Sequence, residues 1–514
     1  MQRLGIIDLG SNTARLVVYA YEAGSWFRLE DEIREPIRLA SGFGDGSRLS
    51  PGAIKRCVTA LKLFQDYALA SGLKNINIIA TSAVRDADNK NRLLKRLRPL
   101  DLPVQILSGE EEAQRGVLAV ANGLAVEDAW VTDLGGGSLE ISRMGSRRFL
   151  FGESFPLGMV RLTERFLKSD PPTREEVKHL EQALKRSLWP YVQRMKKDDA
   201  PLVALGGSVR NLARAVQKRN QYPLSLLHGY PLLRTDLAKL TSRLLRRNQE
   251  KRQAIPGIRA DRADVILASA LLFRWLLSRS GRDRLIISGH GLREGTLYHH
   301  LLPAPHLKKS VKAFAVEDLL SQFPQPKGHI LHTRRLARTL FEGLRPLHKL
   351  ANRYQEILDA AAALHDVGQV LSYYRHAQHG VYLMGSRPLT GFWHREQALI
   401  MQLIRYHEKG NPKLAPFEGL LSPKYLPRLL RLTACLRLAE HLERSRAGRV
   451  RDLSIEIGKK NVEICLEVED KPTLELWEAQ KMAAPLFERA FRRRLLLTTK
   501  KTKKAPINLL EAVS

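Results

Sequence analysis

The feature that most constrains the fold of this chain is a short motif that occurs twice. Near the N-terminus an apolar run leads into Asp8-Leu-Gly10-Ser11-Asn12-Thr13. A second apolar run, 125 residues further on, leads into Asp133-Leu-Gly135-Gly136-Gly137-Ser138. Each copy is followed by another apolar run, so each predicts a β-hairpin with glycine at its turn. Because the residue types occur in the same order in both copies, the two copies predict a duplicated unit whose turns face each other.

These turns have the composition of a phosphate site. Glycine lets the main chain approach an anion closely, and consecutive N–H groups in a turn bind anions. An aspartate at the strand end, here Asp8 or Asp133, can hold a divalent cation beside the phosphate. The alternative that both segments are ordinary glycine-containing turns without a ligand stays open at this point.

Three further segments fit the same cleft. A third strand, turn and helix at 201–213 contains Gly206, Gly207 and Ser208, whose N–H groups would suit an anion. A strand at 77–81 runs toward Arg85, which could bind a phosphate or be a solvated loop residue. Three glutamates open the helix after Ser108, where their charge suits the helix dipole. Ser108 and Glu111 have the spacing of a capping box, which leaves Glu112 as the candidate general base.

Local patterns also predict secondary structure. Strands are expected at 14–21, 26–32 and 104–107, and Ser50 and Gly72 mark the start and the end of a helix. Thr173 and Glu176 form a second expected capping box, at the start of a long basic helix that ends near Lys197.

The composition changes after a proline-containing segment at 302–306, where we expect the main domain boundary. Long helices follow, and nine of the 15 histidines lie between His329 and His441. Candidates for a metal site in this part are His332, His365, Asp366, His376, His379, His394, His407 and Glu440. A histidine is more often a core or surface residue, and a full site would want aspartate at position 440. From the sequence we therefore expect no tightly bound transition metal. A β-hairpin with its turn at Gly458 and a solvated basic tail (Arg492 to Arg494, then Lys500, Lys501, Lys503 and Lys504) end the chain.

The net charge predicts a polyanionic partner. The chain has 84 Lys and Arg against 53 Asp and Glu, a formal charge of +31 and an estimated pI of 10.2. No helix-turn-helix, zinc-finger or RNA-recognition motif is present, so a flexible polyanion fits better than sequence-specific nucleic acid binding. We find no membrane-spanning run, no signal peptide and only three scattered cysteines, and we expect a cytoplasmic protein.

The motifs together resemble a known family. In this order, the segments that begin at Asp8, Thr81, Ser108, Asp133, Gly206 and Leu292 are similar to those of the exopolyphosphatase/guanosine pentaphosphatase (Ppx/GppA) family. The resemblance covers residues 1 to about 300 and implies an actin-like fold of two ribonuclease-H-like α/β subdomains around a phosphate cleft. The C-terminal half, with His365-Asp366 and the histidines that follow, is similar to the mostly helical HD-like domain of longer members.

The resemblance also assigns roles. It implies that Glu112 is the general base and that Asp133 and Glu140, with Asp8, hold Mg²⁺ or Mn²⁺. It implies phosphate contacts from Ser11 to Thr13, Arg85 and Gly135 to Ser138, as well as a homodimer. Leu139 and Leu205 replace residues that relatives often carry as threonine, but neither change removes a main-chain donor. For the HD-like domain the resemblance suggests polyanion binding or dimer formation.

We therefore expect four segments: α/β subdomains at 1–125 and 126–302, a helical HD-like domain at 307–448, and a hairpin, helix and basic tail at 449–514. The expected function is exopolyphosphatase, which releases orthophosphate from the end of inorganic polyphosphate. Two alternatives remain: a 5′-phosphohydrolase of guanosine pentaphosphate (pppGpp), and a protein that binds polyphosphate or senses nucleotides without hydrolysis.

Overall fold

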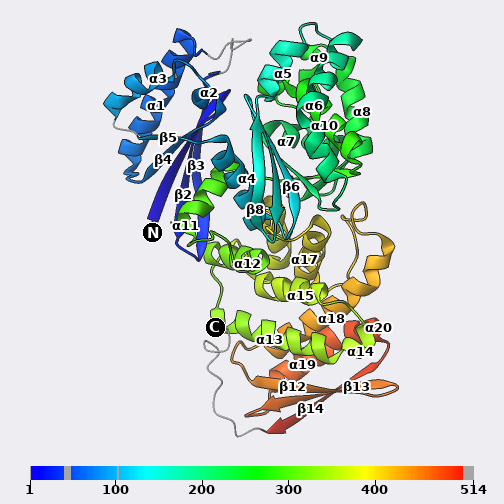
Figure 1. Cartoon of the computed structure of the whole chain (residues 1–514). Helices are drawn as coiled ribbons and strands as arrows, with labels where there is room; N and C mark the ends of the chain where they lie inside the picture. Colours follow the sequence, from blue (N-terminus) through cyan, green and yellow to red (C-terminus); the bar gives the residue numbers. More distant parts are fainter. Residues whose placement is uncertain (1, 40–47, 101–102, 502–514) are drawn as a thin grey trace. The chain divides into compact units, whose positions relative to one another are not determined.

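The computed structural model describes residues 2–39, 48–100 and 103–501. The chain divides into two compact units (Figure 1). The first comprises residues 1–221 and 227–314, and the second comprises residues 222–226 and 315–514. Within the described ranges, none of the helices combines the length and the apolar character needed to cross a membrane.

The first unit begins with a five-stranded mixed sheet. In spatial order its strands are β3 (Trp26–Pro36), β2 (Thr13–Glu22), β1 (Gln2–Leu9), β4 (Ile76–Ala80) and β5 (Val104–Ile106). The strands β1, β2 and β3 form an antiparallel meander, and β4 and β5 continue the sheet parallel to β1. Apolar side chains of one sheet face pack against α1 (Pro51–Ser71) and α3 (Lys90–Leu97). A short helix, α2 (Ser82–Arg85), follows β4.

The second sheet repeats this plan. Its order is β10 (Tyr230–Leu233), β11 (Arg284–Ile287), β9 (Leu202–Leu205), β6 (Ala129–Leu134), β7 (Leu139–Gly145) and β8 (Arg148–Phe155). Again three consecutive strands, β6 to β8, form an antiparallel meander, and two later strands lie parallel to its first strand. Only β10, antiparallel to β11, has no counterpart in the first sheet. The duplication predicted from the two turn motifs and the α/β class of this half are confirmed.

Helices complete the first unit. They are α4 (Gly109–Gly123), α5 (Met159–Phe166), α6 (Arg174–Met195), α7 (Gly207–Arg219), α8 (Arg234–Leu245), α9 (Gln249–Gln253), α10 (Ile266–Ser280) and α11 (Leu292–Leu301). Helix α4 follows the first sheet but packs on β6, β7 and β8 of the second. Helix α11 follows the second sheet but packs on α4 and on β1, where Leu297 joins a buried cluster with Leu4 and Ile6. The two helices therefore tie the two sheets of this unit together.

The predicted helix caps are present. Ser50 accepts a hydrogen bond from the Ala53 N–H group, and Gly72 ends α1 in the left-handed region at φ 66°. The capping boxes of Ser108 with Glu111 and of Thr173 with Glu176 are both formed. Because these signals are contacts between residues three positions apart, local sequence was sufficient to place them.

The second unit is mostly helical. Its main helices are α13 (Lys327–Gly343), α14 (Arg345–His348), α15 (Arg353–Leu364), α16 (His376–Ser386), α17 (His394–Tyr406), α18 (Leu426–Leu442), α19 (Thr473–Glu478) and α20 (Ala484–Phe491). Helix α12 (Val311–Gln322) spans the limit between the units. That limit lies beyond the expected linker at 302–306, since Lys308 is buried and donates hydrogen bonds to Asn122 in α4. The domain limits drawn from the sequence stay predictions.

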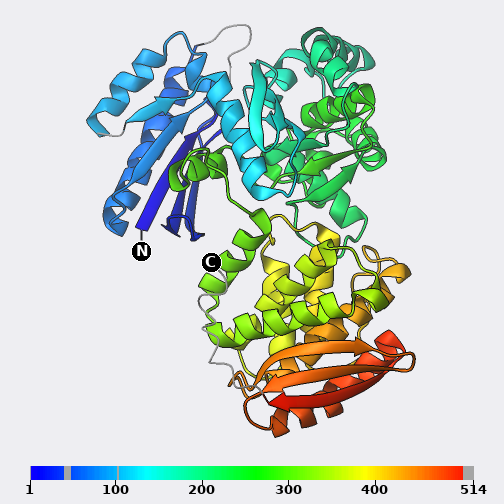
Figure 2. The ribbon, with the colours of Figure 1, turned by 60° about the horizontal axis from the view of Figure 1, so that its bottom comes forward.

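A three-stranded sheet covers one side of this unit (Figure 2). The predicted hairpin is present as β12 (Val450–Ile457) and β13 (Asn461–Val468). The basic residues Arg492, Arg494, Lys500 and Lys501 are exposed as expected. They do not form an irregular tail, because Arg494–Lys501 forms β14, parallel to β13. Burial of Leu495 anchors this strand, while Lys500 and Lys501 are exposed at its end. Lys503 and Lys504 lie outside the described residues.

Candidate active site

A cleft of the first unit brings the two turn motifs together. The predicted site residues that line it are Asp8, Gly10, Ser11, Asn12, Thr13, Glu112, Asp133, Gly135, Gly136, Ser138, Glu140, Gly206 and Gly207. They come from elements that are far apart in the sequence. Three predicted residues, Arg85, Gly137 and Ser208, are not on its wall.

The two hairpin turns have the same construction. In the first, Leu9 pairs with Ala14, and the Gly10 N–H donates to the Thr13 carbonyl at 3.1 Å. The second hairpin repeats this with Leu134 paired to Leu139 and a bond of 3.0 Å from Gly135 to Ser138. Identical register and identical closing bonds in both hairpins show that the sequence repeat is a structural repeat.

The turns also touch each other, and glycine is required where they do. A Cβ atom at Gly136 would lie 2.9 Å from the Cβ of Ser11, and one at Gly137 would lie 2.6 Å from the hydroxyls of Ser11 and Ser82. Cβ atoms do not approach other heavy atoms this closely without something shifting. Gly137 therefore lies behind the cleft surface, packed on two serines.

The start of α5 fixes the peptide planes of the second turn. The N–H groups of Gly158, Met159 and Val160 donate to the carbonyls of residues 137, 135 and 136, at 3.3, 3.0 and 2.9 Å. Within the described part of the chain, the Gly136 and Gly137 N–H groups have no acceptor. A turn whose carbonyls are bound on one side and whose N–H groups are unused is suited to an anion.

A third glycine turn adjoins the second. Gly206 has φ 105°, and a Cβ there would meet the Leu134 carbonyl at 2.6 Å, so only glycine fits. Gly207 begins α7 and lines the cleft. The Ser208 side chain is fully buried and donates to the sulfur of Met159 at 2.6 Å, so its hydroxyl is directed away from the cleft.

Five carboxylates line this cleft, and four of them, Asp8, Glu112, Asp133 and Glu140, are among the predicted site residues. Burial raises the pKa of Glu112 to about 7 and that of Asp133 to about 6, against opposing effects of Arg85 and Arg210. Burial, followed by the charges of Glu112 and Asp133, raises the pKa of Glu140 well above its usual value. The pKa of Asp8 is raised too, mainly by burial. These acids would be stabilised in their ionised forms by a cation among them.

Arg85 lies next to the candidate base. One guanidinium nitrogen donates to the Glu112 carboxylate at 2.8 Å and to the Leu107 carbonyl at 3.1 Å. The other donates to the hydroxyl of Ser154 at 3.3 Å, and Ser154 donates to Glu140 at 2.7 Å. Arg85 thus orients Glu112 and links it to Glu140, a relation that the isolated motifs did not reveal.

Sequence reasoning missed five charged residues of the cleft, which are Arg15, Arg210, Arg262, Arg293 and Glu294. Arg210 donates to the Gly289 carbonyl at 2.8 Å, while Glu294 accepts from the Gly291 N–H at 2.8 Å and from the Tyr19 hydroxyl at 3.3 Å. Arg293 and Arg210 are the main positive charges opposing the raised pKa values of Asp8 and Asp133. Both arginines lie in segments that carried the family resemblance, so the signal was present without an assigned role.

The donor set fits a hard divalent cation. Asp133 and Glu140 on the paired strands β6 and β7, together with Asp8 on β1 of the first sheet, supply carboxylate oxygens. No imidazole or thiol is among the residues lining this cleft. Oxygen ligands of this kind are preferred by Mg²⁺ and Mn²⁺.

Comparisons with known proteins agree with this geometry. Residues 17–304 match the sequence profile of the Ppx/GppA phosphatase family, and residues 311–481 match that of Ppx/GppA phosphatase, domain III. Exopolyphosphatase 2 of Mycobacterium tuberculosis is 31% identical over 311 residues, which are 57% of this chain and 97% of that protein.

One solved structure shows the same fold, and a second is similar in sequence. The crystal structure of an exopolyphosphatase from Cytophaga hutchinsonii has a TM-score of 0.54 at 24% identity, over 58% of this chain and 98% of that one. The Ppx/GppA family member from Aquifex aeolicus is 30% identical, with a TM-score of 0.49, over 58% of this chain and 96% of that one. The first likeness confirms the actin-like fold predicted for the N-terminal half.

Proposed function

Because the chain belongs to the Ppx/GppA phosphatase family, we propose that it is an exopolyphosphatase, which removes terminal phosphate from inorganic polyphosphate with Mg²⁺ or Mn²⁺. The observation that carries the proposal is the meeting of two identically closed glycine turns and four carboxylates in one cleft. In this arrangement the turns bind phosphate oxygens and the carboxylates serve the metal and the attacking water.

The turns hold the terminal phosphates. The main-chain N–H group of Gly136 and the side chains of Ser11 to Thr13 donate to phosphate oxygens, with Gly10, Gly135, Gly137, Ser138 and the third turn at Gly206 to Ser208 beside them. Arg210 and Arg293 add positive charge at the same place. Phosphoryl transfer depends mainly on positioning and charge stabilisation, which these groups provide.

The carboxylates Asp8, Asp133 and Glu140 would hold the divalent cation, whose charge offsets the charge that develops on the phosphate. Ser154 donates to Glu140 and keeps this carboxylate in place. Met159, at the start of α5, binds the turn that carries the phosphate and also lines the cleft.

Glu112 accepts the proton of the attacking water. Its pKa of about 7, raised by burial, suits a base that works near neutral pH. Arg85 fixes the carboxylate and is proposed to approach phosphate as the cleft fills. Oxygen of the water bonds to the terminal phosphorus while the bond from that phosphorus to the bridging oxygen breaks. Orthophosphate and a chain shorter by one unit are released.

The net charge favours the long substrate. A polyphosphate of many units carries roughly one negative charge per phosphate, and a protein with a formal charge of +31 attracts such a chain along much of its surface. A nucleotide such as pppGpp can use only the cleft and its neighbours. The relative from Mycobacterium tuberculosis, which is named an exopolyphosphatase, supports the same choice.

Phosphate release from long-chain polyphosphate, tripolyphosphate and pppGpp tests the proposal directly. We expect kcat/KM to be highest for long-chain polyphosphate, and removal of divalent cations by a chelator to stop release. Preferential release from pppGpp would favour the guanosine pentaphosphatase alternative. Tight polyphosphate binding without release would favour a binding protein. We also propose that the protein is a homodimer. Its molar mass, measured by light scattering during size-exclusion chromatography, tests this.

A further inference from the structure

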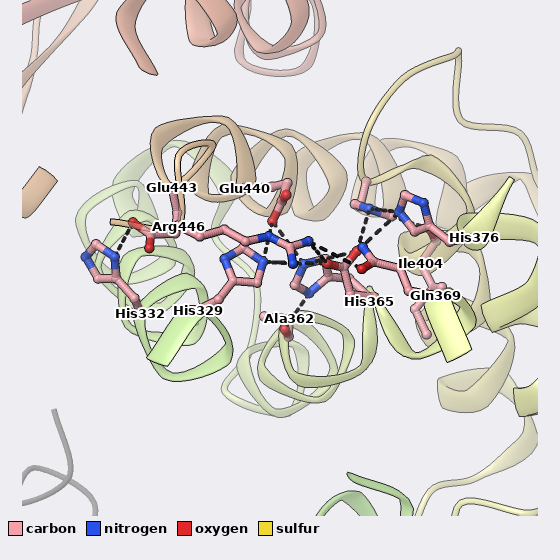
Figure 3. A network of polar contacts seen from close by, with 12 residues as sticks. His329, His332, Ala362, His365, Gln369, His376, Ile404, Glu440, Glu443 and Arg446 are labelled. Atoms are coloured by element: carbon pink, nitrogen blue, oxygen red, sulfur yellow. Dashed lines mark hydrogen bonds and ion pairs between the residues drawn. The ribbon is translucent and has the colours of Figure 1, made fainter. Parts of the chain in front are cut away.

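Buried histidines and carboxylates converge in the second unit (Figure 3). We call this group the His–Asp cluster, and its members are His329, His365, Asp366, His376, His407 and Glu440. They come from α13, the end of α15, the start of α16, the end of α17 and α18. Each is at most 5% exposed. Such a group needs a physical reason to be buried, because polar side chains without partners are costly in a protein interior.

Main-chain carbonyls fix the orientation of three of the rings. Nδ1 of His365 lies 2.8 Å from the Ala362 carbonyl, Nδ1 of His376 lies 3.0 Å from that of Tyr373, and Nδ1 of His407 lies 2.7 Å from that of Ile404. A carbonyl only accepts, so in each ring Nδ1 carries the proton. In the neutral ring Nε2 is then a lone pair, and all three lone pairs face the cluster. Metal-binding histidines usually show this arrangement.

The inward nitrogens come close in pairs. Nε2 of His376 lies 3.1 Å from Nε2 of His407, and Nε2 of His365 lies 3.2 Å from Nε2 of His329. In the neutral rings of His376 and His407 both Nε2 atoms carry lone pairs, which repel at this distance unless a proton or a metal ion lies between them. Of these two occupants, a metal ion also satisfies the carboxylates that lie in the same place.

The cluster contains two sets of donors that share Asp366. His329, His365 and Asp366 form one set, and Asp366, His376 and His407 form the other. In the second set the distances from Oδ1 of Asp366 are 3.2 Å to His376 and 3.8 Å to His407. Donors that are each about 2.1 Å from one ion lie about 3 to 4 Å apart. The spacing of both sets is therefore that of ligands around a common ion.

Glu440 completes the first set. Its Oε2 lies 2.9 Å from Nε2 of His365 and 3.4 Å from Nε2 of His329. Despite this proximity, Oε2 has no hydrogen bond of acceptable geometry among the described residues. Sequence reasoning counted glutamate here against a metal site, but the longer side chain reaches the same centre.

Other histidines of this unit show what a structural histidine looks like. Nε2 of His348 lies 2.7 Å from the Phe341 carbonyl, and its Nδ1 accepts from the Leu350 N–H at 2.9 Å, so both ring nitrogens are used by the backbone. His332 contacts Glu443 at 2.5 Å, and His394 contacts the Tyr222 hydroxyl at 3.0 Å. His379 is absent from both donor sets. None of these four rings contributes to either donor set.

We propose that the His–Asp cluster is a binuclear transition-metal site with Asp366 as the bridging ligand. Mixed imidazole and carboxylate donors select Mn²⁺, Fe²⁺, Co²⁺, Ni²⁺ or Zn²⁺ over Mg²⁺. This replaces the expectation from sequence that the region holds no transition metal. Arg446, which donates to Oδ2 of Asp366 at 2.7 Å and is partly exposed, lies at the edge of the site. The site is separate in residues and in donor type from the all-oxygen set of the phosphate cleft.

Metal analysis of the full-length protein tests the proposal. After chelation and desalting, the protein is incubated with Co²⁺ or Zn²⁺, desalted again and analysed by mass spectrometry. We expect about two ions per chain, the visible absorption of protein-bound Co²⁺ and a higher Tm than that of the chelated protein. Fewer than about 0.2 ions per chain would overturn the proposal, with no variant needed.

Variants then locate the ions. Asp366→Ala should lose both ions and the rise in Tm, whereas the double variant H376A/H407A should lose about one ion and keep the other. His348→Ala removes an equally buried histidine and should keep the full complement. Unchanged metal content in Asp366→Ala, or loss of metal in His348→Ala, would overturn the assignment to this cluster.

Discussion

Glu111 and Glu112 are adjacent in the sequence but have different surroundings. Glu111 accepts from the Ser108 N–H at 2.7 Å and closes a capping box, whereas Glu112 pairs with Arg85 and lines the cleft. We predict that Glu112→Gln lowers kcat by roughly 10² to 10⁴, because glutamine cannot take the proton of the attacking water. Polyphosphate binding should change little. Phosphate release and equilibrium binding measure the two effects separately.

Glu111→Gln is the matched control. Glutamine can still serve in a capping box, so the cost in the free energy of unfolding should be about 1 kcal/mol or less, with kcat near that of the wild type. The assignment of Glu112 as the base fails if this variant keeps more than about a tenth of wild-type activity, or if Glu111→Gln proves to be the inactive one.

Asp133 should determine the metal requirement. It lies opposite Glu140 in the β6–β7 hairpin, and burial raises its pKa to about 6. We predict that Asp133→Asn raises the Mg²⁺ concentration needed for half-maximal activity by about tenfold or more, because the amide keeps the shape but loses the charge that holds the cation. Titration of activity with Mg²⁺ measures this shift. An unchanged titration curve would contradict the role of Asp133 as a ligand.

At the scale of helices and strands, sequence patterns correctly predicted the helix caps and turns, which are determined by contacts between residues close in the sequence. The caps at Ser50 and Gly72 and the boxes at Ser108 and Thr173 form as expected, since their partners are a few residues away. The two glycine turns were recognised because the same sequence pattern occurs twice in the chain. Most residues of the candidate site could be predicted from the sequence for the same reason.

Contacts between segments that are far apart in the sequence could not be predicted from these local patterns. Strand β14 pairs in parallel with β13 across the intervening helical segment at 473–491, and its basic sequence is typical of a solvated tail. The ion pair of Arg85 with Glu112 joins the end of α2 to the start of α4, 27 residues further along the chain. In the His–Asp cluster, residues of five helices meet, and the contact of Glu440 with His365 depends on how α18 packs beside the end of α15. No local sequence pattern predicts how these helices and strands pack together.

The start of α5 offers a test of the glycine turn as a unit. Gly158 has an ordinary φ of −65°, but a Cβ there would lie 2.3 Å from the Gly136 carbonyl oxygen. We predict that Gly158→Ala displaces the turn, costs about 1 to 3 kcal/mol of stability and lowers kcat/KM by at least about tenfold. Gly52→Ala, where Cβ would meet only Arg56 at 3.5 Å, is the control and should be nearly neutral. Thermal unfolding and phosphate release distinguish the two, and equal behaviour would argue against the clamp.

For the whole molecule, the charge of +31 is the property that separates the two enzymatic alternatives. A long polyphosphate that contacts several Lys and Arg residues releases bound counterions, as nucleic acids do, so its affinity should fall steeply with salt. A short substrate touches few charges, and its affinity should fall with a shallower slope whatever the total charge of the protein.

We therefore predict that KM for long-chain polyphosphate rises much more steeply with salt than KM for tripolyphosphate or pppGpp. Steady-state kinetics of the full-length protein between about 50 and 200 mM salt measure the slopes. A protein of residues 1–314 without the second unit should lose most of the difference and keep hydrolysis of short chains, since relatives of about that length cover the first unit alone. Equal slopes for long and short substrates in the full-length protein would mean that the basic surface does not bind the substrate chain. The pppGpp alternative would then explain the cleft better, because a ligand confined to it needs no charge beyond Arg210, Arg293 and the glycine turns.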